Sequence, residues 1–175
     1  MSDTFAPGAR AGIDFEGRLD DIRRRLDEVA PAPLPAGLTD PDPGGEERWE
    51  AAQVWAHMAE FVGYWHDQLR SVIAEYAGDP VPFGRTKRDA ARIAAIELGR
   101  HEPVDELARR TREALAAVTG DLAGLSTAEW KAAGLHETVG VMDLEAIVER
   151  FIVGHMEEHL DQLKGLATAT ATATD

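Results

Sequence analysis

The sequence predicts a single domain with an all-α fold, a four-helix bundle, and three observations lead to the all-α class. The nine prolines leave two long stretches without proline, residues 44–79 and 104–175, in which long helices can form. Apolar residues recur at spacings of three and four, which is the periodicity of a helix that buries one face. No segment alternates long enough to predict a sheet, since the nearest, TVGVM, is short and interrupted by glycine.

The apolar spacing places five helices along the chain, four long and one short. They are expected at residues 14–30, 46–76, 86–98, 103–122 and 143–166. Thr86 is the expected N-cap of the third helix, and Pro103 suits the first turn of the fourth. Between helices we expect a loop at GDPVPFGR and a short helical turn at STAEWKAAG, where Ser126 and Glu129 form a capping-box pattern.

The second helix carries two adjacent apolar stripes about 100° apart, so it should bury a broad face in the middle of the bundle. The stripes consist of Trp55, Met58, Val62, Trp65, Leu69 and Val72, and of Val54, His57, Phe61, Tyr64 and Gln68. The last helix carries one stripe, made of Leu144, Val148, Phe151, His155, His159, Gln162 and Leu166. These patterns predict that three histidines point into the core.

Length and composition favour one acidic domain at residues 13–166, with flexible segments at 1–12 and in the Thr-rich tail 167–175. The 175 residues include 32 Asp and Glu against 18 Lys and Arg, so the net charge is −14. This charge argues against a nucleic-acid partner, because phosphate binding depends on clustered Lys and Arg. No apolar run is long enough to span a membrane and the N-terminus lacks the order of a signal peptide, so we expect a cytoplasmic protein without membrane association.

Three histidines form the candidate metal site. His155 and His159 make an HxxxH pair on the last helix, where four residues span slightly more than one turn, so both rings emerge on one side. His57 faces inward from the second helix and can meet them. Because the chain has no cysteine, a metal site must use His, Asp or Glu. We therefore expect one divalent ion on three histidines, with a fourth position free for water or substrate.

The alternative is that the three are core histidines whose nitrogens are satisfied by Glu60, Glu158, Tyr64 or backbone carbonyls. In that arrangement each of the three buried rings needs its own hydrogen-bond partners in the core. Glu158 lies about 60° around the helix from His155, so it is a candidate to orient that ligand or to transfer a proton during catalysis. A solvated carboxylate is the other interpretation of Glu158.

The segments WEAAQVWAHMAEFVGYW and VMDLEAIVERFIVGHMEEHLDQL, about a hundred residues apart, resemble the DinB superfamily of damage-inducible and thiol-transferase-like metalloproteins. The resemblance covers about residues 15 to 166. It implies an up-down-down-up bundle, often dimeric, so a homodimer is expected to be accessible. It also implies a divalent metal, zinc or nickel, with His57, His155 and His159 as ligands.

Several members of this superfamily use a low-molecular-weight thiol, such as bacillithiol or mycothiol, as cosubstrate. A related branch, the mycothiol-dependent maleylpyruvate isomerases, has Glu at the first position of the final pair. Here that position is His155, which argues against isomerase activity.

Further candidates surround the three histidines. His66, His101 and His136 fall outside the inward stripes and are expected at the surface, although His136 could border a pocket. Arg85, Lys87 and Arg88 could hold a carboxylate or an anionic cosubstrate, with surface ion pairing as the competing interpretation.

Phe61, Tyr64 and Phe151 lie one helical turn from the ligands, so we expect them to line the pocket that the metal faces. Trp49, Trp55 and Trp65 are expected to pack in the core. Gly63 and Gly154 lie within predicted helices, where glycine is unfavourable relative to alanine, and a close approach of helices could explain both.

Two functions are consistent with these patterns. The first is a metal-dependent enzyme that activates water or an exogenous thiol for attack on a small electrophile, as an S-transferase or a hydrolase. The second is a non-catalytic, metal-stabilised bundle that dimerises or binds a partner. An open fourth coordination position distinguishes the enzyme from the structural module.

Overall fold

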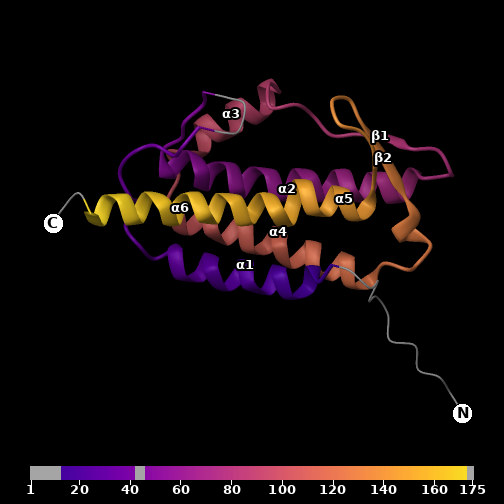
Figure 1. Ribbon diagram of the computed structural model, residues 1–175, viewed down its shortest axis with the longest axis horizontal. Helices are drawn as coiled ribbons and strands as arrows, with labels where there is room; N and C mark the ends of the chain where they lie inside the picture. The colour runs from indigo at the N-terminus through magenta and orange to yellow at the C-terminus, as the bar shows by residue number, and fades with distance from the viewer. Residues whose placement is uncertain (1–12, 42–45, 173–175) are drawn as a thin grey trace, which may run out of the picture.

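The computed structural model describes residues 13–41 and 46–172, which fold into the predicted helical bundle with a small sheet at one end (Figure 1). The helices are α1 (Phe15–Val29), α2 (Ala51–Glu75), α3 (Ala90–Gly99), α4 (Val104–Gly124), α5 (Leu144–Val148) and α6 (Gly154–Thr172). The 3₁₀ turn η1 (Glu129–Lys131) lies between α4 and the sheet, and the π-helical turn η2 (Glu149–Val153) joins α5 to α6. The strands are β1 (Val81–Phe83), β2 (Ala133–His136) and β3 (Gly140–Asp143).

The four long helical segments form the bundle in the expected order. The chain runs in one direction along α1, in the opposite direction along α2 and again along α4, and returns along the continuous segment α5–η2–α6 (Figure 1). This is the up-down-down-up arrangement, and it confirms the predicted fold class. The two parallel neighbours, α2 and α4, are joined by a long connection that contains β1 and α3. Among the described residues, no helix is both long and apolar enough to cross a bilayer.

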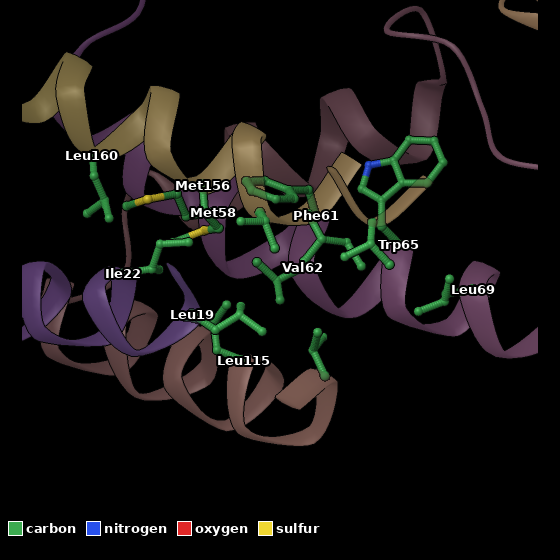
Figure 2. Packing of buried hydrophobic residues seen from close by; sticks show 14 of the residues in the cluster. Leu19, Ile22, Met58, Phe61, Val62, Trp65, Leu69, Leu115, Met156 and Leu160 are labelled. Carbon is green, nitrogen blue, oxygen red and sulfur yellow. The ribbon is translucent and has the colours of Figure 1, made fainter. Parts of the chain in front are cut away.

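The core lies where α1, α2, α4 and α6 face one another. Ile22, Met58 and Met156 come from three different helices and meet in its centre (Figure 2). Phe61 and Val62 are fully buried beside them, so both stripes of α2 are covered at this point. This burial explains why α2 is apolar over a broad face.

Two helices begin later than the sequence predicts, because other contacts replace the first turn. Residues 46–50 are not helical: the backbone N–H of Thr39 donates to the carbonyl of Trp49 at 2.8 Å, and Glu50 has an extended backbone. Helix α2 therefore begins at Ala51, with Glu50 as its N-cap in a capping box. The N-cap of α3 is Asp89, whose carboxylate accepts from the backbone N–H of Arg92 at 2.8 Å, so the assignment of Thr86 was wrong.

The expectation that the chain forms no sheet was wrong. Strand β1 pairs in parallel with β2, and β2 pairs antiparallel with β3. The predicted loop GDPVPFGR thus contains β1, in which Val81 and Phe83 are buried while Pro82 is exposed. Strands of three or four residues are too short for an alternation pattern, and the partner of β1 lies about fifty residues further along the chain.

The predicted flexible tail is helical over residues 167–172, because α6 continues to Thr172. The hydroxyl of Thr168 donates to the carbonyl of Lys164 at 3.0 Å, and that of Thr170 donates to the carbonyls of Leu166 and Ala36. Residues 1–12 and 173–175, for which flexibility was also expected, lie outside the described residues.

A π turn sets the orientation of α6, and Gly154 adapts to it. The extra residue of a π turn rotates all later side chains by about 100° around the helix axis. A Cβ atom at Gly154 would lie 2.8 Å from the carbonyl oxygen of Glu149, so the backbone conformation of the turn requires glycine here. At Gly63 nothing lies within 4 Å of a Cβ atom, so a close approach of helices does not explain this glycine.

The two glycines predict opposite effects of the same substitution. We expect Gly154→Ala to lower the free energy of unfolding by about 1–3 kcal/mol, because the methyl group forces the π turn apart. Gly63→Ala should raise it by about 0.5–1 kcal/mol, because alanine has less backbone entropy to lose and meets no neighbour. Urea denaturation followed by circular dichroism measures both, and shifts in the same direction would contradict the interpretation.

Candidate metal centre

The three predicted histidines meet at one point between α2 and α6. The Nε2 atom of His155 lies 3.1 Å from that of His57 and 3.2 Å from that of His159. All three ligand atoms lie within 4.8 Å of one another. Helix α2 contributes His57 from its inner face, and the first turns of α6 contribute the other two.

Each histidine has an acceptor oxygen near its other ring nitrogen. Gln162 Oε1 lies 2.8 Å from Nδ1 of His159, Glu158 Oε2 lies 3.5 Å from Nδ1 of His155, and Glu60 Oε2 lies 3.7 Å from Nδ1 of His57. In all three cases the acceptor follows its histidine by three residues, so both side chains share a helix face. These oxygens favour the proton on Nδ1, which directs the Nε2 lone pairs toward the common centre.

The surroundings keep two of the rings neutral. Burial lowers the pKa of His57 well below its usual value, and the neighbouring rings of His159 and His155 lower it further. Burial likewise lowers the pKa of His159 to about 3. Neutral imidazole is the form that binds a metal, and converging lone pairs are unfavourable without a cation. The donor set therefore fits a divalent ion better than a cluster of core histidines.

Unpaired buried atoms beside His57 support the same conclusion. Nδ1 of His57 and Oε2 of Glu60 are both buried without a hydrogen-bond partner, although they lie 3.7 Å apart. A carboxylate that accepts from the far nitrogen of a histidine is typical of metal ligands. Arg85 pairs with the other oxygen of Glu60, lies with its guanidinium 3.7 Å from the centre of the Tyr64 ring, and holds the carboxylate in place.

Aromatic rings surround the three imidazoles. Phe61 is fully buried beneath them, with its ring centre 4.5 Å from that of His155 and 4.9 Å from that of His57. Trp49 stacks on His159, with centres 5.9 Å apart and planes within 7°. The centre is therefore closed on the core side.

Two hollows adjoin the centre on its open side, and both include His57 and His155. The mixed hollow, with a volume of about 730 Å³, carries side chains of both signs and is lined by residues that include Asp40, Trp49, Lys87, Glu158, His159 and Asp161. The basic hollow, of about 550 Å³, is lined by residues that include Trp65, Lys87, Arg88, His136, Arg150 and Phe151. The side chain of His155 is 30% exposed, so the centre can be reached from outside.

Within the described residues, the histidine, aspartate and glutamate side chains that could share one ion here are the three histidines alone. Glu158 is not a fourth ligand, since its side chain is 75% exposed and faces Nδ1 of His155. Its contact with the His155 ring lowers the pKa of the Glu158 carboxyl. Three protein ligands leave coordination positions for water or substrate.

The structure places the three residues expected in the pocket wall at different positions. Phe151 lines the basic hollow, but Phe61 forms the buried base of the centre and Tyr64 packs under Arg85. The reason is that α2 is covered on both stripes, so residues one turn from His57 face the core or the neighbouring loop. Trp65 lines the hollow instead, from the adjacent stripe.

Two of the three remaining histidines are buried, although all three were expected at the surface. His101 is exposed, as predicted, but His66 and His136 are buried. Nε2 of His66 lies 2.8 Å from a carboxylate oxygen of Asp121 and thereby links α2 to α4. His136 lies at the wall of the basic hollow, where Nε2 donates to the carbonyl of Arg85 at 3.2 Å. Asp121 and Arg85 are both far in sequence from the histidines that they contact, so no local pattern indicates this burial.

The sequence analysis missed Gln162 and Glu60 as residues that orient ligands, and Trp49 and Arg150 as neighbours of the centre. The regular His-x-x-Glu/Gln spacing is a signal from which the first two could have been found. Trp49 lies before α2, and Arg150 lies in the π turn, so only the tertiary structure brings them to the site.

Comparison with known proteins agrees with this fold. No curated protein matches the chain. Among solved structures, YfiT from Bacillus subtilis, described as a probable metal-dependent hydrolase with an unusual four-helix bundle topology, is similar with a TM-score of 0.69. The two share 18% sequence identity over 96% of this chain and 95% of that one, which shows a common fold. The model of the DinB superfamily matches residues 18–163, so the chain belongs to the DinB superfamily.

Proposed function

We propose that this protein is a metal-dependent enzyme that acts on a small electrophilic substrate, with water or a low-molecular-weight thiol as nucleophile. The observation that carries the proposal is the convergence of three histidine Nε2 atoms beside two hollows, with no fourth protein ligand in the described part of the chain. A structural metal site is normally closed by four protein ligands, whereas a catalytic site keeps a position open. The open centre therefore favours the enzyme over the non-catalytic module.

The chain's own residues orient the ligands and exclude water from one side. Gln162 forms a hydrogen bond with Nδ1 of His159, and Glu158 and Glu60 face the Nδ1 atoms of His155 and His57, while Phe61 closes the core side. A divalent ion held by the histidines supplies a Lewis acid that lowers the pKa of bound water or thiol. Zinc and nickel both suit imidazole ligands. Glu158 has a lowered pKa and is ionised at neutral pH, so its role in proton transfer is that of an acceptor.

Two observations bear on the nucleophile. The description of YfiT as a probable metal-dependent hydrolase supports water. Since this chain has no cysteine, a thiol nucleophile has to arrive as a cosubstrate such as mycothiol or bacillithiol. Two hollows that meet at one centre leave room for a nucleophile and an electrophile on separate sides. Hydrolysis and thiol transfer are thus two outcomes of one experiment.

The experiment loads the full chain with zinc or nickel and measures turnover of activated esters, amides and alkylating electrophiles. Each substrate is tested with water alone and with mycothiol, bacillithiol or glutathione. We expect metal-dependent turnover that His155→Ala lowers by about a thousandfold or more, because the ligand set is lost. His101→Ala is the matched control, since His101 is an exposed histidine outside the site. Full metal loading without turnover under either condition would favour the non-catalytic module.

A further inference from the structure

The basic hollow has an unusual charge for this protein. Lys87, Arg88 and Arg150 are exposed at its rim, and no aspartate or glutamate lines it within the described residues. None of the three forms an ion pair within 4 Å with another described residue. The chain as a whole carries 32 acidic and 18 basic residues, so unpaired cations that gather at one hollow need an explanation.

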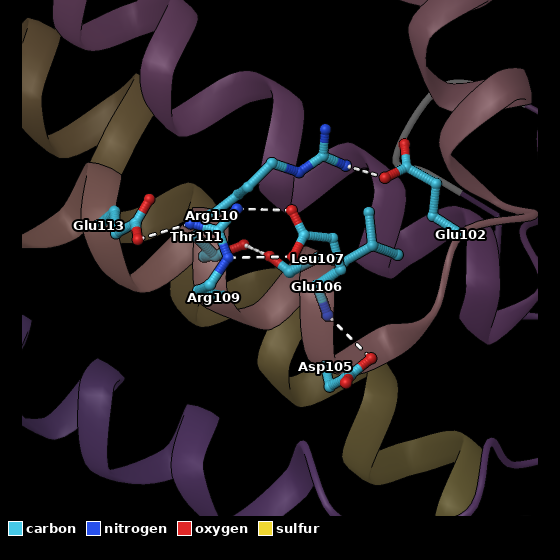
Figure 3. A network of polar contacts seen from close by, with 8 residues as sticks. All are labelled: Glu102, Asp105, Glu106, Leu107, Arg109, Arg110, Thr111 and Glu113. Atoms are coloured by element: carbon cyan, nitrogen blue, oxygen red, sulfur yellow. Dashed lines mark hydrogen bonds and ion pairs between the residues drawn. The ribbon is translucent and has the colours of Figure 1, made fainter.

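Most arginines elsewhere in the described part of the molecule pair with the abundant carboxylates. On α4, Arg109 pairs with Glu106 and Glu113, and Arg110 pairs with Glu102 at 2.9 Å (Figure 3). Within the basic hollow itself, the side chain of Arg85 is only 10% exposed, and its charge is balanced by Glu60 and Asp89. Lys87, Arg88 and Arg150 are thus exposed cations at this hollow whose charge is available to a ligand.

The floor of the hollow is aromatic. The ring of Phe151 stacks on Trp65, with centres 4.1 Å apart, and on His136, with centres 5.2 Å apart. Both nitrogens of His136 are already used, one by the carbonyl of Arg85 and the other by the backbone N–H of Thr138. The floor therefore offers apolar ring surface, and the polar recognition comes from the rim.

We propose that the basic hollow binds a small anionic molecule, whose carboxylate or phosphate group is held by Lys87, Arg88 and Arg150 while its apolar part lies on the rings of Trp65 and Phe151. This inference rests on the proposed function, because His57 and His155 are among the residues that line the hollow, so a molecule bound there lies beside the metal centre. It identifies the electrophilic substrate as an acid or a phosphate ester with a planar or apolar body.

The charge of the second hollow supports this assignment. Asp40, Glu158 and Asp161 line the mixed hollow, and carboxylates there repel an anion. Lys87 is shared by both hollows, whereas Arg88 and Arg150 line only the basic one of the two. An anion is therefore directed to one side of the centre, which leaves the mixed side for the nucleophile.

The test measures binding rather than turnover. Benzoate, neutral benzamide and inorganic phosphate are titrated by calorimetry into the zinc-loaded full chain and into chelator-treated protein at constant ionic strength. We expect benzoate to bind at least about tenfold more tightly than benzamide, because the two differ in charge but share the ring. If phosphate binds more tightly than benzamide while benzoate binds weakly, the site is assigned to phosphate esters, and this result supports the proposal equally.

Two triple variants with the same change in net charge locate the site. Lys87→Gln, Arg88→Gln and Arg150→Gln together should weaken anion binding about tenfold or more, since each removes an exposed, unpaired cation. The control combines Arg48→Gln, Lys131→Gln and Lys164→Gln, which are exposed cations away from the basic hollow, and should change binding less than about threefold.

Equal losses in the two triple variants, or no preference of the native protein for either anion over benzamide, would overturn the proposal. Both triple variants keep the three histidines, so the outcome is separate from that of the proposed function. If metal-dependent turnover fails while the anion preference persists, the hollow is a binding site of a non-catalytic protein. Thermal denaturation of each variant checks that the fold is unchanged.

Discussion

Replacing His159 with alanine is expected to abolish tight metal binding. His159 is buried, its Nδ1 proton is held by Gln162, and its Nε2 atom points at the centre, so its lone pair is aligned before a metal arrives. Two imidazoles hold a divalent ion far more weakly than three, and we expect an affinity loss of about a hundredfold to a thousandfold. Calorimetric titration with zinc and with nickel measures this loss directly.

The same variant should lose the thermal stabilisation that metal confers. A ligand that binds only the folded state stabilises it by about 2.7 kcal/mol at a hundred times its dissociation constant. The melting temperature of the native protein should therefore fall on addition of a chelator, while that of His159→Ala should stay constant. His101→Ala should behave as the native protein, because His101 is exposed and outside the site. Metal-dependent melting of His159→Ala equal to that of the native protein would exclude His159 as a ligand.

Of the substitutions proposed, Phe61→Ala should lower the free energy of unfolding the most. The side chain is fully buried and lies within the core shown in Figure 2. Its ring contacts the imidazole rings of all three histidines. Truncating a buried phenylalanine costs about 3–5 kcal/mol, because apolar contacts are lost and a cavity remains. For a domain of this size, each kcal/mol corresponds to about 2–4 °C in melting temperature.

Phe61→Ala should also weaken metal binding, since the rings of His57 and His155 lose the surface that keeps them in position. Phe61→Leu retains most of the apolar volume and should recover most of both properties. Leu98→Ala is the matched control, because Leu98 is 74% exposed and its truncation should change stability by less than about 0.5 kcal/mol. A loss for Phe61→Ala no larger than that for Leu98→Ala would show that Phe61 does not support the core.

The fold class and the meeting of the three histidines follow from the sequence because both depend on local periodicity. A side chain's position around a helix is set by its spacing from its neighbours, so His57, His155 and His159 could be assigned to inward faces before any contact was known. The acceptors of the ring protons follow from local spacing too, because each lies three residues after its histidine in a His-x-x-Glu/Gln pattern. Helix ends were less accurate where a distant residue competes, as Thr39 does with the first turn predicted for α2.

The small sheet, the π turn and the two hollows were decided only by the tertiary structure. Strand β1 exists because β2 lies beside it, and Gly154 is required because an extra residue brings the Glu149 carbonyl close to it. The basic hollow joins Lys87 and Arg88 from the loop after β1 to Arg150 from the π turn, more than sixty residues away. The sequence by itself thus determined the helices and the three candidate metal ligands, which are properties of single helix faces. The shape and charge of what surrounds them depend on long-range packing, which no local spacing encodes.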